Sequence, residues 1–325
     1  PWTPEDIAPF VTYLASDYAA PINGQVFLVY GGTVTHLSPP RRIKTIYKEN
    51  PPGYWDFNEL NHNIKRFLFP QIPQVSDVVK KQNLKNKVAI VTGGGRGIGR
   101  GIAKKLAKEG ASVVIVDTGV SVDGQIEDKG PAESVVEEIS EFGGQAIACH
   151  EDVTTVMGGQ NIIQLALNTF GKLDILITAA GILRDRMIFN MTEREWDDVI
   201  DVHLKGTFST VKPASNIFRQ QQSGRIITFS SVSGLYGYGG QANYGAAKDA
   251  IAGFTRVVAK DLAKYGVTVN SISPSAHTRM TNSVPDSTRS MRKTEFPNAP
   301  EGTLVDDPEH LAPLVAWLAS DQSFD

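Results

Sequence analysis

The strongest constraint on the fold is a strand, a glycine-rich turn and a helix that follow one another. Residues 87–92 are apolar and rich in β-branched side chains, which is typical of a strand buried in a parallel sheet. Glycines dominate residues 93–99, and apolar residues then recur at helical spacing at Ile98, Ile102 and Leu106. This order predicts a unit whose glycines let the backbone approach a pyrophosphate at the helix N-terminus.

An acidic residue downstream of the turn points to a dinucleotide. A second apolar strand, residues 113–116, ends in Asp117, about 20 residues past the turn, where the dinucleotide fingerprint has an acid. Its carboxylate would accept hydrogen bonds from a ribose diol and repel a 2′-phosphate, whereas Arg96 in the turn could meet such a phosphate. Asp117 carries more weight, so we expect NAD rather than NADP.

A Ser, a Tyr and a Lys form a second constellation. Residues 225–229 predict a fifth strand, and Ser231 follows its end, where ligands bind in open parallel sheets. Tyr244 and Lys248 lie one helical turn apart. The Lys248 ammonium would lower the pKa of the Tyr244 phenol, which makes Tyr244 a candidate general acid or base. Singly, these residues suit a helix cap, a half-buried aromatic and a solvated face, but their joint spacing favours catalysis.

The motifs resemble, in type and order, those of the short-chain dehydrogenases/reductases over residues 84–320. The resemblance implies an α/β fold with a doubly wound parallel sheet of Rossmann type. It also implies that Ser231 orients the substrate oxygen, Tyr244 carries the proton, and Lys248 holds a ribose. Together, the motifs and the resemblance give the cofactor-binding residues as Gly93, Arg96, Gly97, Ile98, Gly99, Asp117, Asp152, Val153, Ala180, Gly181 and Lys248.

Two positions depart from the family pattern. The family has two Asn before Ala-Gly after the fourth strand, and this chain has Thr178 and Ala179, which removes amides from a structural hydrogen-bond network. His203 stands where the family has an Asn on a long helix. It could relay a proton to Lys248 through water or simply pack there, and the sequence leaves both alternatives open.

Longer stretches resemble the (3R)-hydroxyacyl-CoA dehydrogenase module of the multifunctional β-oxidation enzyme, namely residues 118–131, 180–186, 202–208, 237–244 and 273–281. This resemblance implies hydride transfer between NAD(H) and a 3-hydroxyacyl or 3-oxoacyl thioester. A 3-oxoacyl carrier-protein reductase or another secondary-alcohol dehydrogenase is the alternative enzyme. A non-catalytic cofactor-binding partner subunit is the alternative of a different class. For a CoA carrier, Arg184, Arg186 and Arg279 are candidate contacts.

Composition argues against several partners. The net charge of −3, without a basic stripe, argues against nucleic acid, and no apolar run approaches the ~18 residues of a membrane span. The single cysteine, Cys149, allows no disulfide within the chain, which fits a reducing compartment. We expect a cytoplasmic protein, or a peroxisomal one in a eukaryote, and no metal site.

The beginning of the chain repeats its end. Residues 4–17 and 308–321 are identical at nine of fourteen positions, and residues 25–30 look like the strand that follows this helix in the family. A tandem fusion explains the repeat. We therefore predict three segments: a C-terminal remnant of a preceding reductase module (1–38), a linker rich in Pro and aromatics (39–83), and an NAD-binding module without its last strand (84–325).

A fusion of this kind predicts a dimer or pseudo-dimer with a second reductase module. Residues 5–30 would finish the missing first module, which we favour, or complete the second sheet by pairing residues 25–30 with 267–272. The aromatic residues of the linker predict packing on a partner surface, with a short helix within 56–69. We expect the substrate loop at 281–307.

Overall fold

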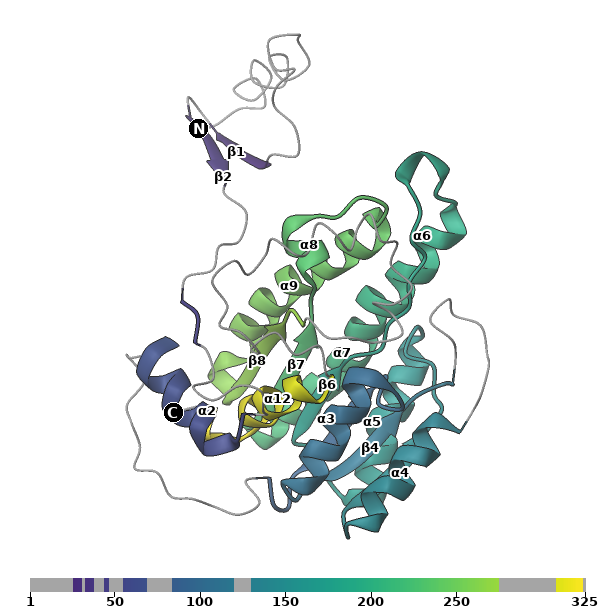
Figure 1. Cartoon of the computed structure of the whole chain (residues 1–325), viewed down its shortest axis with the longest axis vertical. Coiled ribbons are helices and arrows are strands. Elements are labelled where there is room, and N and C mark those ends of the chain that lie inside the picture. Colours follow the sequence, from purple (N-terminus) through teal and green to yellow (C-terminus); the bar gives the residue numbers. More distant parts are fainter. Residues whose placement is uncertain are drawn as a thin grey trace. The chain divides into compact units, whose positions relative to one another are not determined.

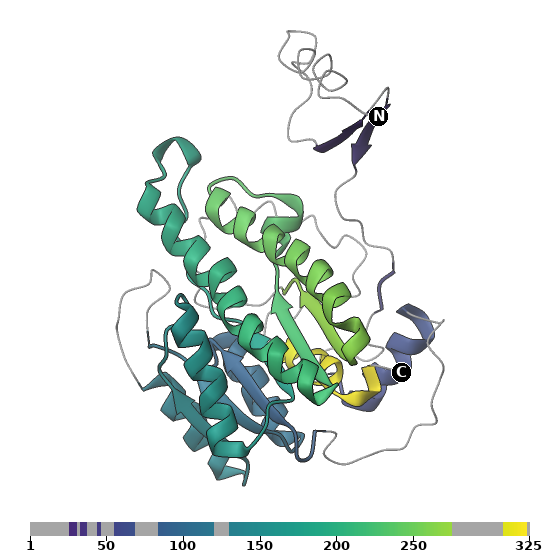
Figure 2. The ribbon, with the colours of Figure 1, turned by 180° about the vertical axis from the view of Figure 1, so that it is seen from behind.

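The structure, a computed structural model, describes most of the chain (Figures 1 and 2). The described residues are 26–30, 33–37, 44–46, 55–68, 84–119, 130–274 and 308–323. The chain divides into two units, Pro1–Ile43 and Lys44–Asp325, and each is treated separately below.

The described part of the second unit is built on a sheet of six parallel strands. The strands are β3 (Val88–Thr92), β4 (Ser112–Val116), β5 (Gln145–Cys149), β6 (Ile175–Thr178), β7 (Gly224–Phe229) and β8 (Val267–Ile272). Their spatial order is β5-β4-β3-β6-β7-β8, so the order reverses between β3 and β6. This is the strand order of doubly wound dinucleotide-binding folds, and the predicted fold class is confirmed.

Helices cover both faces of this sheet (Figures 1 and 2). On one face lie α3 (Gly97–Lys108), α4 (Pro131–Glu141) and α12 (Ala312–Ala319), and on the other lie α5 (Val156–Phe170), α7 (Gly206–Gln221) and α9 (Ala242–Leu262). The shorter helices are α2 (Phe57–Asn63), α6 (Glu193–Ile200) and α8 (Val232–Tyr236). None of the described helices is long and apolar enough to cross a membrane.

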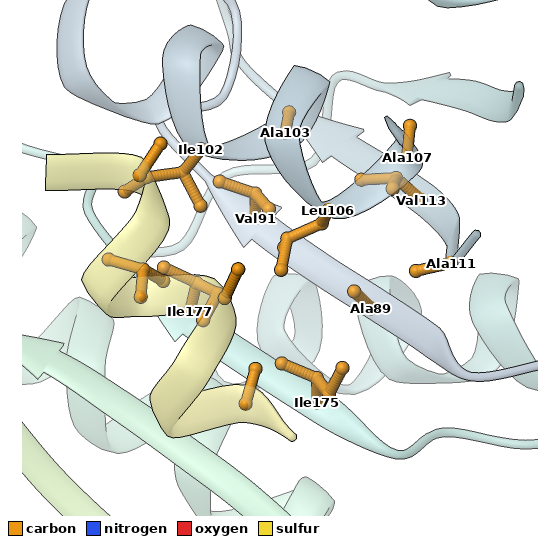
Figure 3. Packing of buried hydrophobic residues seen from close by; sticks show 14 of the residues in the cluster. Ala89, Val91, Ile102, Ala103, Leu106, Ala107, Ala111, Val113, Ile175 and Ile177 are labelled. Atoms are coloured by element: carbon orange, nitrogen blue, oxygen red, sulfur yellow. The ribbon is translucent and has the colours of Figure 1, made fainter. Parts of the chain in front are cut away.

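Alternate side chains of the central strands enter two different cores. Ala89 and Val91 of β3 belong to the core under α3 and α12, whereas Val88 and Ile90 belong to the core on the opposite face. Figure 3 shows Leu106 of α3 against Ala89 and Val91. Because β3 is buried on both faces, the apolar run at 87–92 could be recognised as a central parallel strand from its sequence.

A glycine in α5 sets the distance between two helices. A Cβ at Gly159 would collide with the main-chain oxygen of Ser209 in α7. Gly253 in α9 is in a different setting, because a Cβ there would have Nη2 of Arg256 as its nearest atom, 3.8 Å away. The close approach of α5 to α7 therefore requires a glycine at position 159, whereas no such close approach requires one at position 253.

We predict that Gly159→Ala destabilises the protein by about 2 kcal/mol, because the two helices must separate to admit the methyl group. Gly253→Ala is the matched control and is expected to be neutral or stabilising by about 0.5 kcal/mol, since alanine favours a helix interior. Denaturant unfolding of both variants measures this. Equal stabilities of the two variants would contradict the close approach.

The segment expected to be a linker contains a helix that packs on its own unit. Within the predicted 56–69, α2 is followed by a π-helical turn, Ile64–Leu68. Leu60 and Ile64 are buried against Trp317 of α12, and the Trp317 indole N–H donates to Oδ1 of Asn61 at 3.1 Å. We expected the linker aromatics to meet a partner surface. The structure instead places this part of the linker on α12.

In the first unit, a strand occurs where the sequence predicted one. β1 (Val26–Tyr30) pairs antiparallel with β2 (Thr33–Leu37). Pairing of this strand with residues 267–272, the less favoured of the two alternatives, is therefore wrong, because the partner of β1 is β2. The partner a few residues along the chain is reached with a far smaller loop-closure cost than β8. The first copy of the repeat and residues 281–307 lie outside the described residues.

Candidate active site

A cavity of about 260 Å³ lies at the carboxyl ends of the strands, where the strand order reverses. Every site residue predicted from the sequence lines it except Ser231. The predicted residues that line it are Gly93, Arg96, Gly97, Ile98, Gly99, Asp117, Asp152, Val153, Ala180, Gly181, Tyr244 and Lys248. Connections that follow several different strands therefore meet at one crevice.

Backbone crowding explains the glycines of the turn. Gly93 has φ +65°, and a Cβ there would lie 2.8 Å from Cα of Ala180. A Cβ at Gly99 would collide with the main-chain oxygen of Gly93, and one at Gly95 would lie 2.7 Å from Oδ2 of Asp117. Among the described residues, the N-cap residue Arg96 makes no side-chain capping hydrogen bond to α3, so the first N–H groups of this helix suit the pyrophosphate of a dinucleotide.

Asp117 has a structural task that the sequence did not reveal. Its Oδ2 accepts a hydrogen bond from the Gly95 N–H at 3.0 Å, and its Oδ1 accepts one from the Gly119 N–H at 2.9 Å. The carboxylate thus ties the glycine turn to the end of β4. Because a carboxylate can accept about four hydrogen bonds, Asp117 retains capacity for a ribose diol.

Lys248 is buried at the end of β7 and is held there by main-chain contacts. Its Nζ donates to the Phe229 carbonyl at 2.8 Å, and the Ser230 hydroxyl donates to the Lys248 carbonyl at 2.8 Å. Nζ lies 5.6 Å from the centroid of the Tyr244 ring. Burial lowers the pKa of Lys248 to about 7. A small change in its surroundings therefore changes its charge near neutral pH.

A buried amide fixes the start of the helix that carries Tyr244. Asn243 donates through Nδ2 to the carbonyls of Arg184 and Glu195, at 3.0 and 2.9 Å. Its Oδ1 accepts from the Tyr244 N–H at 2.8 Å. All the hydrogen-bonding capacity of this amide but one lone pair is used, which fixes Tyr244 relative to α6. Our sequence analysis missed Asn243, although its position immediately before Tyr244 was a signal.

Ser231 does not line the cavity. It is buried at the N-cap of α8, where its Oγ accepts from the Ser233 N–H at 3.2 Å. This is the helix-cap alternative that the sequence allowed. The bond uses an oxygen lone pair, so the Ser231 O–H can still donate to another oxygen. Its neighbour Ser230 lines the cavity instead.

His203 is buried between the end of β6 and Tyr244. Its Nε2 lies 2.8 Å from the Ile182 carbonyl oxygen and 3.2 Å from the Ile182 nitrogen. Its ring meets the Tyr244 ring edge to face, with centroids 5.1 Å apart. Burial, and then the charge of Lys248, lower the pKa of His203 to about 3. The imidazole is therefore neutral in the folded protein near neutral pH.

The structure also bears on Thr178, which departs from the family pattern, and on the arginines considered as CoA contacts. Oγ1 of Thr178, which replaces a family Asn, is buried without a hydrogen-bond partner among the described residues. This agrees with the expected loss of a structural network. Two of the arginines considered for CoA are engaged by α6, since Arg184 pairs with Asp198 at 3.2 Å and Arg186 pairs with Glu195 at 3.0 Å. Arg279 lies outside the described residues.

The neutral His203 predicts how stability depends on pH. Its folded pKa of about 3 lies below the ordinary 6.5, so below pH 6.5 the unfolded chain binds a proton that the folded chain does not. Between pH 7 and pH 5 this costs about 2 kcal/mol of stability. His203→Asn removes the titration, so the variant should lose about 2 kcal/mol less than the wild type over this range in denaturant unfolding.

The difference in unfolding free energy between the wild type and His203→Asn at pH 7 measures any packing cost of the substitution and serves as the control. An equal loss of stability on acidification in both proteins would mean that His203 is protonated in the folded state.

A doubly wound sheet with a glycine-lined crevice at its switch point defines the class of dinucleotide-binding α/β proteins. Within that class, the family model of the short chain dehydrogenases matches residues 87–289. The chain belongs to this family.

Three relatives illustrate what the chain is similar to. It is 39% identical to the peroxisomal hydratase-dehydrogenase-epimerase of Saccharomyces cerevisiae over 98% of this chain, and spans only 36% of that relative's length. It is 40% identical to the 3-oxoacyl-[acyl-carrier-protein] reductase FabG of Staphylococcus aureus, covering 73% of this chain and 92% of that protein. The crystal structure of a short chain dehydrogenase from Mycobacterium avium matches with 43% identity and a TM-score of 0.62, over 74% of this chain and 79% of that one.

Proposed function

We propose that this chain is an oxidoreductase that transfers a hydride between a nicotinamide dinucleotide and a 3-hydroxyacyl or 3-oxoacyl thioester. The observation that carries the proposal is that Tyr244 and Lys248 face the same cavity as the glycine turn. The substrate class is supported by the two relatives, because one is named a hydratase-dehydrogenase-epimerase and the other a 3-oxoacyl reductase. A dehydrogenase of other secondary alcohols remains the alternative enzyme.

The residues present fit a dinucleotide. The glycine turn and the N-terminus of α3 would hold its pyrophosphate, Asp117 its adenosine ribose, and Lys248 its second ribose. When bound, the nicotinamide supplies or accepts the hydride. Tyr244 would then exchange a proton with the substrate oxygen, and the Lys248 ammonium would favour the phenolate form of Tyr244. The Ser231 O–H would donate to the same oxygen.

We predict that Tyr244→Phe lowers the turnover of acetoacetyl-CoA with NADH by at least about 100-fold, because the proton-transferring hydroxyl is removed. NADH affinity should stay within a few fold, since the ring is retained. Initial rates and NADH fluorescence titration measure the two quantities. A variant that keeps a tenth of the wild-type rate would contradict the role of Tyr244.

The same assay separates an enzyme from a non-catalytic cofactor-binding subunit, the alternative of a different class. An active wild type excludes the subunit alternative, and wild-type NADH binding without turnover of any thioester would favour it.

We propose NAD as the cofactor because the Asp117 carboxylate follows β4 at the position of an adenosine ribose and would repel a 2′-phosphate. Asp117→Asn is expected to narrow the ratio of NADH to NADPH affinity by about tenfold. The amide oxygen can still accept from a glycine N–H, which limits collapse of the turn. A wild type that binds NADPH more tightly than NADH would overturn this proposal and would indicate that Arg96, rather than Asp117, decides the cofactor preference.

We further propose that the chain is part of a tandem fusion, with residues 1–38 from a preceding reductase module, 39–83 as a connection and 84–325 as the second module. The repeat of residues 4–17 at 308–321 and the match over 98% of the chain to a multifunctional relative support this. The two modules would associate as a pseudo-dimer. The relative's name also favours a peroxisomal location over the cytoplasmic one expected from composition.

A further inference from the structure

Both ring nitrogens of His150 contact acceptor atoms on neighbouring elements. His150 directly follows β5, and its Nδ1 lies 2.9 Å from the main-chain oxygen of Asp117. Its Nε2 lies 2.6 Å from Oε1 of Glu133, in the first turn of α4. The imidazole therefore bridges the end of β4 and the start of α4, and the proposed ribose acceptor Asp117 stands at one end of this bridge.

Neither partner of the imidazole can donate a hydrogen bond to it. A main-chain carbonyl carries no proton, and an ionised carboxylate only accepts. A neutral imidazole has a single N–H, so it can serve one partner and must turn a lone pair toward the other. The imidazolium has two N–H groups and serves both. The contacts of His150 with Asp117 and Glu133 therefore fit the protonated ring.

One end of the bridge holds the main chain of Asp117. The Asp117 N–H donates to the Cys149 carbonyl at 3.0 Å, which extends the pairing of β4 with β5 by one residue. The Asp117 carbonyl is the atom that faces His150, and its carboxylate accepts from the Gly95 N–H. A shift of this residue would thus move both the ribose acceptor and the glycine turn.

The other end of the bridge lies close to the same turn. A Cβ at Gly95 would lie 2.8 Å from Cβ of Pro131, the first residue of α4, so the start of this helix packs against the glycine turn. Glu133 follows two residues later. Both residues that His150 joins therefore belong to segments that touch the turn proposed to hold the pyrophosphate.

We propose that His150 is a positioning residue for the cofactor, which in its protonated form ties Asp117 to Glu133 and so holds the ribose acceptor beside the glycine turn. Loss of the proton as the pH rises places a lone pair against one of the two acceptors and loosens the bridge. NADH affinity then falls as His150 is deprotonated. This inference rests on the proposed function, since it takes Asp117 as the residue that holds the ribose.

Other charged groups stand on the elements that meet at His150. In the described part of the chain they are Asp117 after β4, Glu151 and Asp152 after His150 itself, Glu137 and Glu138 on α4, and Arg96 and Arg100 at the start of α3. Glu151 accepts from Asn161 at 3.2 Å, and Asp152 accepts from Thr154 at 2.8 Å. Glu133, at 2.6 Å, is thus the carboxylate that most directly favours the imidazolium.

The test compares Glu133→Gln with Glu137→Gln in the full chain. A glutamine at 133 can turn its amide, so its oxygen accepts from the imidazolium and its N–H donates to the neutral ring. The bridge then persists in either protonation state. Glu137 is exposed one turn further along α4, and Glu137→Gln is the matched control because it removes the same charge without touching the bridge.

Fluorescence titration of NADH gives the first readout. We expect the Kd of the wild type, divided by that of Glu133→Gln, to rise about threefold between pH 6 and pH 8.5, because only the wild type loses a contact. The same ratio for Glu137→Gln should stay constant. Titration of Lys248 acts alike on all three proteins and cancels in the ratios. A constant ratio for Glu133→Gln would overturn the inference.

NMR gives a second readout that a merely structural contact would not move. The ring C–H signals of His150, assigned by their loss in His150→Gln, report its protonation directly. Their titration midpoint should lie at a higher pH in the wild type than in Glu133→Gln, because the carboxylate favours the charged ring. Equal midpoints would overturn the bridge.

The variant His150→Gln keeps the inference testable even where Glu133→Gln folds poorly. Its amide can serve one of the two partners, as the neutral imidazole does. Its Kd for NADH should therefore exceed the wild-type value about threefold at pH 6 and approach it at pH 8.5. A constant excess would show a role in packing alone and overturn the inference. A wild type that binds no NADH would contradict the proposed function instead, and the NMR titration would still decide whether Glu133 holds His150 protonated.

Discussion

The approach of the β3 glycine turn to the end of β6 is the constraint on which the crevice depends. A Cβ at Gly93 would lie 2.8 Å from Cα of Ala180, and a Cβ at Gly99 would collide with the main-chain oxygen of Gly93. No side chain fits at either position, so the crevice between the two halves of the sheet is narrow and lined by backbone. The crevice results from the order of the strands. It opens between β3 and β6, because the helices that follow these two strands lie on opposite faces of the sheet. The elements that carry Asp117 and Lys248 reach it from neighbouring strands.

Much of the central sheet and of the candidate site could be predicted from the sequence. A parallel strand buried on both faces is apolar at nearly every position, so residues 87–92 and 113–116 were recognisable without knowledge of their neighbours. The glycines, Asp117 and the Tyr244–Lys248 spacing were recognisable because a close approach or a helical turn leaves a pattern in one short stretch. These residues line a single cavity, although their roles in binding and catalysis remain predictions.

Contacts between main-chain atoms and distant segments could not be predicted. The carbonyl that receives the Lys248 ammonium belongs to Phe229, whose side chain has no part in the contact. Ser231 was expected to meet the substrate oxygen, and it also caps α8, because its Oγ accepts a hydrogen bond from the Ser233 N–H. The pairing of residues 26–30 with 33–37 was not anticipated, because both alternatives considered for this strand followed the family pattern. The helix at 57–63 was expected, but nothing local indicated that α12 is its partner.

The buried lysine and the neutral histidine are best understood together. Burying Lys248 disfavours its ammonium, and a protonated His203 beside it would disfavour that charge further. The chain avoids this by burying His203 as well, because burial lowers the pKa of the imidazole and keeps it neutral, whereas the contact with the Ile182 carbonyl acts in the opposite direction. A histidine in this position contacts the Ile182 carbonyl through Nε2 and packs its ring edge to face against Tyr244. The departure from the family pattern at this position therefore adds a buried ring against Tyr244 without adding a charge beside the buried lysine.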